Sequence, residues 1–302
     1  MGHAWSSLPT PVVSAVISAA VALVVAVVAP SLKYGFDKRF HRRKLDIEYT
    51  YEQQKELRNR IALYKGLLLE TGGALRNRLW NFLKHEGHGW LRMRGSCAES
   101  GYYLRSFAYR ILCLVAACRL IERQALYVDS VVAAPSDRRF LEAMKLNIAV
   151  WTRADLYAGL PYDGGRNDDH FFRDQLTDMA DTLYQDGRLL SFTEFSRRLA
   201  ENDDEYRTVF VFLNGAGRQE RNRFRFDRLI AVQLVLLATL NRFGYAYQQV
   251  SFDRFGAVAR ACEHPVVLAN LCAMTRELGL DEEKGFRQML TAATATATTT
   301  GH

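Results

Sequence analysis

The sequence predicts an all-α protein: one N-terminal transmembrane helix that continues into a long juxtamembrane helix, followed by a multi-helix cytosolic domain. Three observations predict this class. An uncharged apolar run lies near the N-terminus, apolar residues further along recur at helical spacing, and the rhythm of βαβ units is missing. With 302 residues, 49% hydrophobic and 24% charged, the chain can form a sizeable core.

The apolar run at residues 12–29 is the predicted membrane anchor. It contains no charged residue, and as a helix it would be about 27 Å long, close to the roughly 30 Å hydrocarbon thickness of a bilayer. We therefore place a transmembrane helix at residues 11–32. A cleaved signal peptide would carry basic residues before the apolar run, whereas residues 1–10 contain no Lys or Arg. A buried core helix is the other alternative, but no second segment matches this run.

A basic segment at residues 33–44 follows the apolar run and carries a net charge of +5. By the positive-inside rule, residues 1–10 form a short extracytoplasmic tail and the bulk of the chain is cytoplasmic, at an inner or plasma membrane. Contacts with anionic lipid headgroups are expected from Lys33, Lys38, Arg39, Arg42, Arg43 and Lys44. Because the whole chain carries +7, only +2 remains elsewhere, so nucleic acid is not an expected partner.

Residues 33–84 are predicted to form one long, basic juxtamembrane helix. Apolar residues with 4-3-4 spacing occur at Leu57, Ile61, Tyr64 and Leu68. This spacing fits either a short intermolecular coiled coil or an amphipathic helix packed on its own domain. Gln54 and Arg58 interrupt the heptads, which favours packing on the same domain.

The helical cytosolic domain is predicted to cover residues 85–290, and residues 291–302 to form a disordered Ala/Thr tail. Ser191 and Glu194 form a capping-box pattern before a short helix that ends at Ala200. Further helices are expected at residues 102–132, 138–158, 170–185, 219–243, 252–262, 265–279 and 282–290. One stretch, residues 205–215, has the composition of a strand.

The stretch at residues 170–181 is the strongest catalytic candidate. Acid–base or metal-binding side chains on one predicted helix face are His170, Asp174, Asp178 and Asp181. At about 100° per residue, all four lie opposite the apolar residues of the same helix, so a solvated acidic face is the preferred interpretation.

A basic stripe in the sequence is formed by Arg218, Arg221, Arg225 and Arg228. At helical spacing these residues lie within an arc of about 80°, where they could contact phosphate, RNA or a protein partner. A third interpretation is that they pair, within the domain or between subunits, with the acidic segment at residues 163–186, which carries a net charge of −5.

Metal and cofactor sites are not expected. The sparse groups around His85, His88 and Cys97, and around Cys262, His264 and Cys272, do not have the four-ligand spacing of structural zinc. We find no P-loop, no nucleophile elbow and no kinase signature. The five cysteines are an odd number and are expected to be reduced thiols, most of them buried.

The apolar run and the charged stretch at residues 38–64, KRFHRRKLDIEYTYEQQKELRNRIALY, resemble the N-terminal part of uncharacterised bacterial single-pass membrane proteins. In these, one anchor leads into a basic juxtamembrane helix and a helical cytosolic domain. The likeness is architectural, covers about the first quarter of the chain, and implies no activity, cofactor or catalytic residue. Arg outnumbers Lys 32 to 8, which is also typical of a GC-rich bacterial genome.

Three functional hypotheses follow. The first is a membrane-anchored scaffold, sensor or regulatory interaction module at the cytosolic face, which binds an unknown protein partner or self-associates. The second is a membrane-tethered enzyme with its site at residues 170–181. The third is a phosphate- or RNA-binding effector that uses residues 218–228.

Overall fold

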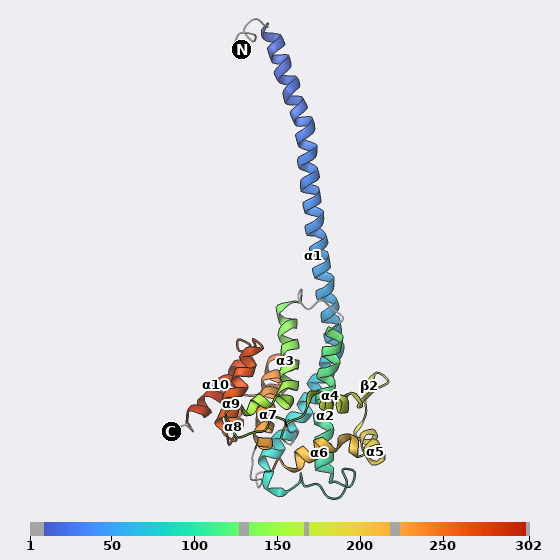
Figure 1. Cartoon of the computed structure of the whole chain (residues 1–302), viewed down its shortest axis with the longest axis vertical. Coiled ribbons are helices and arrows are strands. Elements are labelled where there is room, and N and C mark those ends of the chain that lie inside the picture. The colour runs from blue at the N-terminus through green and yellow to red at the C-terminus, as the bar shows by residue number, and fades with distance from the viewer. Residues whose placement is uncertain (1–8, 127–132, 166–168, 218–223, 300–302) are drawn as a thin grey trace. The chain divides into compact units, whose positions relative to one another are not determined.

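The structure is a computed structural model that describes residues 9–126, 133–165, 169–217 and 224–299 (Figure 1). Within these ranges the regular secondary structure is helical apart from one two-stranded hairpin, which confirms the all-α class. The chain divides into two units, a first unit Met1–Lys55 and a second unit Glu56–His302. The boundary lies inside the first helix, about thirty residues before the predicted start of the domain.

The first unit is formed by the N-terminal part of α1, a helix that spans Thr10–Lys84. Its window Pro11–Val28 is long and apolar enough to cross a membrane, and none of these residues is buried. Leu23, for example, is 70% exposed. In the described part of the chain, no other helix combines this length with this apolarity. The prediction of an apolar N-terminal helix of membrane-spanning length is thus confirmed.

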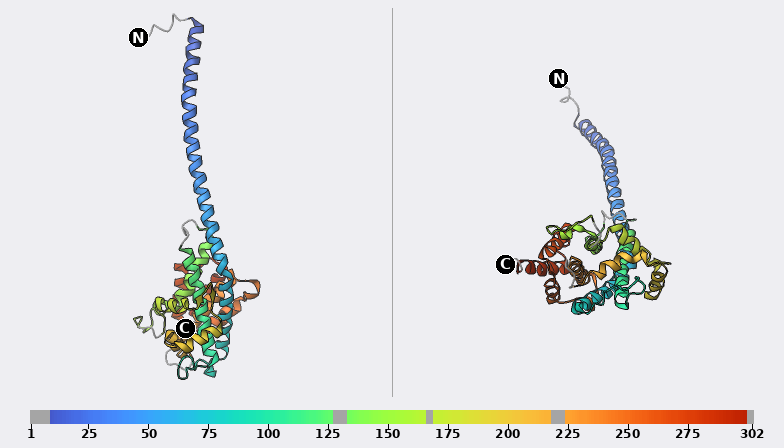
Figure 2. Two further views of the ribbon diagram at one scale, coloured as in Figure 1. Left: turned by 90° about the vertical axis from the view of Figure 1, so that its right-hand side faces the viewer. Right: turned by 60° about the horizontal axis from the view of Figure 1, so that its bottom comes forward.

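The second unit contains the remaining helices. They are α2 (Tyr102–Ala125), α3 (Pro135–Thr152), α4 (Arg173–Asp181), α5 (Phe192–Glu201), α6 (Arg207–Asn214), α7 (Phe224–Phe243), α8 (Phe252–Ala259), α9 (Pro265–Glu277) and α10 (Lys284–Thr299). Short 3₁₀ turns occur at η1 (Glu86–His88), η3 (Ala154–Tyr157), η4 (Asp204–Tyr206) and η5 (Ala246–Gln248). Helices α8, α9 and α10 lie on one side of this unit, α4 and α5 on the other, and α2, α3 and α7 between them (Figure 1; Figure 2).

Helix α7 forms the centre of this unit. Nearly all of its residues are buried, and it packs against α3, α8, α9 and α10. The uncharged, largely apolar part of α7 is the stretch 229–240. A helical stretch that is apolar all round must be enclosed by other elements, and this stretch is too short to cross a membrane. A buried hydrogen bond of 2.9 Å from the Asn147 side-chain amide to the Thr239 hydroxyl joins α3 to α7.

The part of α1 in the second unit packs into the same core. Leu57, Ile61 and Leu68 are buried there, and Leu75 is fully enclosed. Since their side chains are buried within their own unit, they are not available as an intermolecular coiled-coil seam. The interpretation as an amphipathic helix is therefore the correct one.

Two local predictions around residues 182–215 are wrong. Residues 205–215 do not form a strand; they form η4 and α6 because Val209, Phe212 and Leu213 recur at helical spacing and face the core. The helix predicted to reach residue 185 ends at Asp181, and a hairpin of β1 (Tyr184–Gln185) and β2 (Arg188–Leu189) follows.

The turn of this hairpin explains why the helix ends early. Asp186 and Gly187 both have positive φ, 50° and 79°, as a type I′ turn requires, and Asp-Gly is a favoured pair there.

The predicted capping box at the start of α5 is confirmed. Glu194 N–H donates to the Ser191 hydroxyl (3.3 Å), and Ser191 N–H donates to the Glu194 carboxylate (2.7 Å).

The predicted disordered tail is also wrong for most of its length. Helix α10 continues to Thr299, and Ala292 and Ala293 are buried. Alanine has the highest helix propensity, and its small side chain lets α10 pack closely against its neighbours α7, α8 and α9.

Substitution of Gly285 tests how closely α10 packs against α7. A Cβ atom built at Gly285 would collide with the Ala238 carbonyl oxygen of α7. We expect Gly285→Ala to lower the free energy of unfolding by about 1–3 kcal/mol, because α10 must move away from α7. Gly66→Ala is the matched control: its Cβ would meet no atom within 4 Å, so it should stabilise α1 by up to about 1 kcal/mol. Urea unfolding of the full chain in detergent measures both, and equal effects of the two substitutions would contradict the packing.

Candidate functional site

The predicted acidic face is not a converged site. Helix α4 begins three residues after His170, which is only 2% exposed, so this side chain does not share a face with the aspartates. Asp174 and Asp178 are exposed on α4, and Asp181 forms an ion pair with Arg123 of α2. The prediction is wrong at His170 because the turn before α4 folds the imidazole inward.

His170 is enclosed by aromatic side chains. The Tyr162 hydroxyl hydrogen-bonds to its Nδ1 atom, and the Phe172 ring contacts the imidazole edge-on with centroids 5.5 Å apart. Burial lowers the pKa of His170, and the positive charge of Arg228 lowers it further. The imidazole is therefore neutral at neutral pH, and its geometry is that of a packed structural side chain.

Arg228 is fully buried and is not a surface contact, so this part of the predicted basic stripe is wrong. Its Nε atom donates to the Tyr157 hydroxyl (3.0 Å) and the Asp169 carbonyl (2.9 Å). Its two Nη atoms donate to the carbonyls of Val150 (2.6 Å) and Arg153 (3.0 Å). The guanidinium also lies over the Tyr157 ring, 4.6 Å from its centre. This buried charge is satisfied by oxygen acceptors alone, since no carboxylate among the described residues pairs with it.

Arg225 supports the third interpretation of the basic stripe. Its Nε atom lies 2.7 Å from an Asp169 carboxylate oxygen, and its Nη1 atom donates to the Val211 carbonyl at 2.9 Å. The acidic and basic segments thus pair within the second unit at this position. Arg218 and Arg221 lie outside the described residues.

Asp227 is a buried carboxylate that the sequence interpretation missed. It accepts hydrogen bonds from the backbone N–H groups of Glu263 (2.8 Å) and His264 (3.0 Å) and lies 2.6 Å from the His264 ring nitrogen. The available signal was the charged pair Asp227-Arg228 directly before the apolar stretch 229–240 of the same helix. Asp227 and Arg228 together attach α7 to the loops before α4 and before α9. This polar cluster is therefore a structural device that joins distant loops to the central helix.

Among the described residues, no group of three or more His, Cys, Asp or Glu side chains could hold a metal ion.

All five cysteines are free and buried, in agreement with the prediction. Burial raises the pKa of Cys113 to about 12 and that of Cys118 further, so both are protonated and unreactive at neutral pH.

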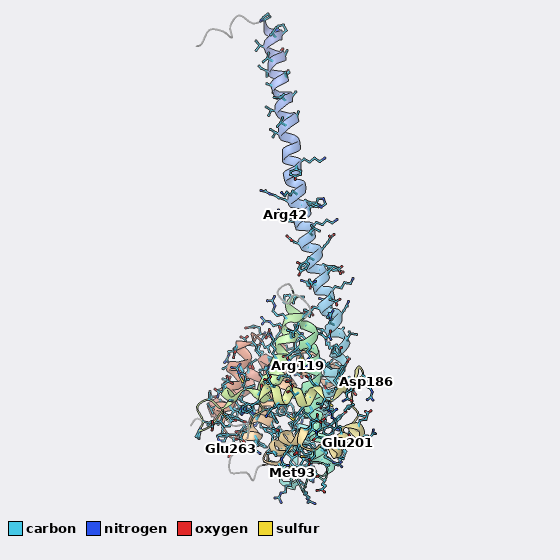
Figure 3. The ribbon with its side chains drawn as sticks, turned by 45° about the vertical axis from the view of Figure 1, so that its right-hand side comes forward. Arg42, Met93, Arg119, Asp186, Glu201 and Glu263 are labelled. Atoms are coloured by element: carbon cyan, nitrogen blue, oxygen red, sulfur yellow. The ribbon has the colours of Figure 1, made fainter. Side chains whose placement is uncertain are left out.

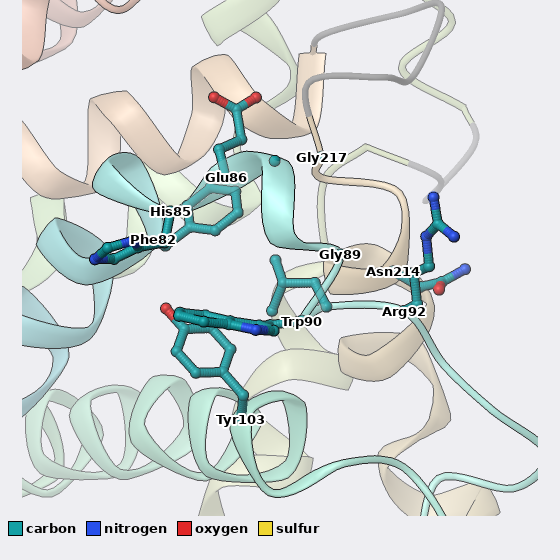
Figure 4. Close-up of a pocket in the computed structure, with 11 residues that line it drawn as sticks. Phe82, His85, Glu86, Gly89, Trp90, Arg92, Tyr103, Asn214 and Gly217 are labelled. Carbon is teal, nitrogen blue, oxygen red and sulfur yellow. The ribbon is translucent and has the colours of Figure 1, made fainter.

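His85 and His88 belong to an aromatic cluster, and His85 lines a small pocket of about 90 Å³ beside it (Figure 4). The Trp90 ring lies 4.8 Å from His88 and 5.0 Å from Tyr103, centre to centre. Trp90 and Tyr103 form one side of the pocket, and Phe82 and His85 the other (Figure 4). These ring contacts, tilted or edge-on, hold the loop after α1 against α2, which gives the two histidines a packing role.

A wider groove of about 660 Å³ lies between the C-terminal half of α2 and α3, a volume typical of ligand and partner sites. Its apolar floor includes Ala125, Leu141, Ala149 and Leu278. Charged side chains surround this floor, and each has a counter-ion: Arg173–Glu122 (3.0 Å), Lys145–Glu142 (2.9 Å) and Arg153–Glu277 (2.7 Å). An apolar centre with a neutralised polar rim is the anatomy of a protein-binding surface.

The basic segment of α1 has its charged side chains in solvent. Arg42 projects from the helix (Figure 3), and the other five predicted contact residues are exposed as well. Lys44 lies 3.7 Å from Glu48. Tyr34 and Phe40 are exposed among these cations, and aromatic side chains are common at the depth of lipid headgroups.

No protein-family model, curated protein or solved structure matches the chain. Its function is therefore inferred from the surfaces, cavities and charges of the chain itself. The structure contains the helical architecture and the apolar N-terminal helix that the expected likeness requires, and membership of a class of bacterial single-pass membrane proteins stays a prediction.

Substitution of Arg228 tests the polar cluster. Arg228→Met removes the hydrogen bonds to the Val150, Arg153 and Asp169 carbonyls and to the Tyr157 hydroxyl, and we expect a loss of about 3 kcal/mol or more in the free energy of unfolding. Arg207→Met is the control, since Arg207 is exposed and its one ion pair with a described residue, Asp204, is 3.9 Å long; its effect should stay within about 0.5 kcal/mol. Urea unfolding followed by circular dichroism measures both. A change at Arg228 no larger than that at Arg207 would show that the cluster does not hold the loops.

Proposed function

We propose that this protein is a single-pass membrane protein whose helical domain acts as a scaffold, sensor or regulatory interaction module at the cytosolic face. The observation that carries the proposal is the apolar window Pro11–Val28, none of which is buried. Removing one Val or Leu side chain from water contributes about 1.5–3 kcal/mol. An apolar surface of this length is stable only when something apolar covers it, and its length matches a bilayer.

The charges after the window support the orientation. Six exposed cations follow Pro11–Val28 within residues 33–44, whereas residues 1–10 contain none. Each Lys or Arg near an anionic membrane surface contributes about 1 kcal/mol of attraction. The positive-inside rule then puts the second unit in the cytoplasm.

An interaction module is better supported than an enzyme. His170 is enclosed and neutral, while Asp174 and Asp178 are solvated on an exposed face, so these groups do not meet around a substrate-sized space. The groove between α2 and α3 has instead the apolar floor and paired charges of a partner-binding surface. The hypothesis of an RNA-binding effector that uses residues 218–228 is also less well supported, because Arg228 is buried and Arg225 is paired with Asp169.

Extraction of membranes with alkaline carbonate tests the anchor. We expect the full chain to stay in the membrane pellet, because an inserted helix resists conditions that strip peripheral proteins. A variant with both Val21→Arg and Val24→Arg should be released, since each arginine near the centre of a membrane helix costs about 2.5–3.5 kcal/mol. Tyr49→Arg is the matched control, because Tyr49 is exposed on α1 beyond the basic segment; it should stay in the pellet. Release of the unmodified chain would refute the proposed anchor.

A further inference from the structure

A small cavity of about 140 Å³ lies in the second unit, between α1, α7 and the segment that leads into α8. Arg76 and Trp80 come from α1, one helical turn apart, so their side chains share a face. Gln233 comes from α7, Tyr247 from η5 and Arg254 from α8. Since all five residues belong to the second unit, the site does not depend on the proposed membrane anchor.

The two arginines of this cavity have no acidic partner. No Asp or Glu lines the cavity, and within the described ranges no carboxylate forms an ion pair with Arg76 or Arg254. Burial lowers the pKa of Arg76, and the positive charge of Arg254 lowers it further. An arginine side chain carries a positive charge in proteins. Two neighbouring cations without a counter-ion in a half-buried space repel each other, and a bound anion would remove this repulsion.

Trp80 holds the guanidinium of Arg254 in position. The Arg254 Cζ atom lies 3.6 Å from the centre of the Trp80 ring, so the flat face of the guanidinium is stacked while the N–H groups at its edge remain available. Arg76 uses Nε and Nη2 to reach the Asn77 side-chain oxygen and Nη1 to reach the Gln248 carbonyl. A guanidinium has five N–H groups, so about two of those on Arg76 remain for a ligand.

Gln233 is a second and independent sign of a ligand. Its side chain lines the cavity but is only 1% exposed, and its Oε1 atom has no hydrogen-bond partner in the described part of the chain. A buried amide without a partner carries a free-energy cost that nearly all such groups in proteins avoid. Because the two ends of a Gln amide can exchange by a flip, this side chain can offer its NH₂ group to an anion.

We propose that this cavity binds a phosphoryl group, which Arg76 and Arg254 hold by charge-assisted hydrogen bonds and Gln233 by a neutral one. A phosphomonoester carries a charge of about −1.5 to −2 at neutral pH and three acceptor oxygens, which matches two guanidinium groups. A carboxylate carries one charge and would leave the site with an uncompensated cation. The phosphoryl group can belong to a soluble phosphomonoester or to a lipid with a phosphomonoester headgroup.

Calorimetric titration of the full chain in neutral detergent micelles with methyl phosphate tests the proposal. The controls are methyl sulfate, which has the same shape and one charge, and acetate, all at constant ionic strength. We expect saturable binding of methyl phosphate, at least about tenfold tighter than that of either control, because only the dianion neutralises both arginines.

Variants locate the binding. Arg254→Gln and Arg76→Gln should each weaken methyl phosphate binding by about tenfold or more, and Arg254→Lys should weaken it less, since it keeps the charge without the stacked fork. Arg260→Gln is the matched control, because Arg260 is exposed at the end of α8 and does not line the cavity; it should bind like the unmodified chain. Circular dichroism confirms that each variant is folded.

A second arm separates the two sources of the phosphoryl group. Mixed micelles that contain phosphatidic acid are compared with micelles that contain phosphatidylcholine. If binding of phosphatidic acid depends on Arg254 and outcompetes methyl phosphate, the ligand is a lipid headgroup; if methyl phosphate binds and phosphatidic acid does not, the ligand is soluble. The proposal is overturned if neither probe binds in an Arg254-dependent way, or if both glutamine variants bind methyl phosphate like the unmodified chain.

Discussion

The constraint on which this structure depends is the apolar surface of α1 at Pro11–Val28, which the protein itself leaves uncovered. The hydrophobic effect does not permit such a surface to stay in water, so its surroundings must supply the apolar contact. The same helix buries Leu57, Leu68 and Leu75 in the core of the second unit. Thr10–Lys84 is thus one element with two burial requirements, one met by the domain and one that we assign to a lipid bilayer.

The second unit is organised around α7. This helix is enclosed on all sides, and the adjacent Asp227 and Arg228 attach two loops to its first turn. Further along, Gln233 remains unsatisfied beside the arginine cavity that it shares with α1 and α8. The central helix therefore combines a structural polar cluster with the proposed phosphoryl site. The charged groups of the cluster are hydrogen-bonded within the protein, whereas the cavity keeps N–H groups of Arg76 and the amide of Gln233 for a ligand.

The apolar N-terminal helix and the helical class could be predicted from sequence because both follow from local composition and period. The strand predicted at residues 205–215 failed because its aromatic and β-branched composition outweighed the helical spacing of Val209, Phe212 and Leu213. The burial of Arg228 could not be predicted, since its acceptors at Val150 and Asp169 are far away in the chain.

The same limit applies to the phosphoryl site. Arg76 and Arg254 lie far apart in the sequence, on α1 and α8, and no spacing rule joins them. Their lack of acidic partners becomes visible only when the packing of α1, α7 and α8 is known. Local patterns thus predict elements, while sites made from several elements require the structure.

Cysteine labelling tests most directly whether α1 spans a bilayer in the proposed orientation. The five native cysteines are buried, so single cysteines introduced by Ser7→Cys and Glu52→Cys can be probed with a membrane-impermeant maleimide over a low background. In intact cells, we predict labelling at position 7 only, with position 52 labelled after the membrane is permeabilised. Labelling of position 52 in intact cells, or protection of both positions, would contradict a single-pass protein with its helical domain in the cytoplasm.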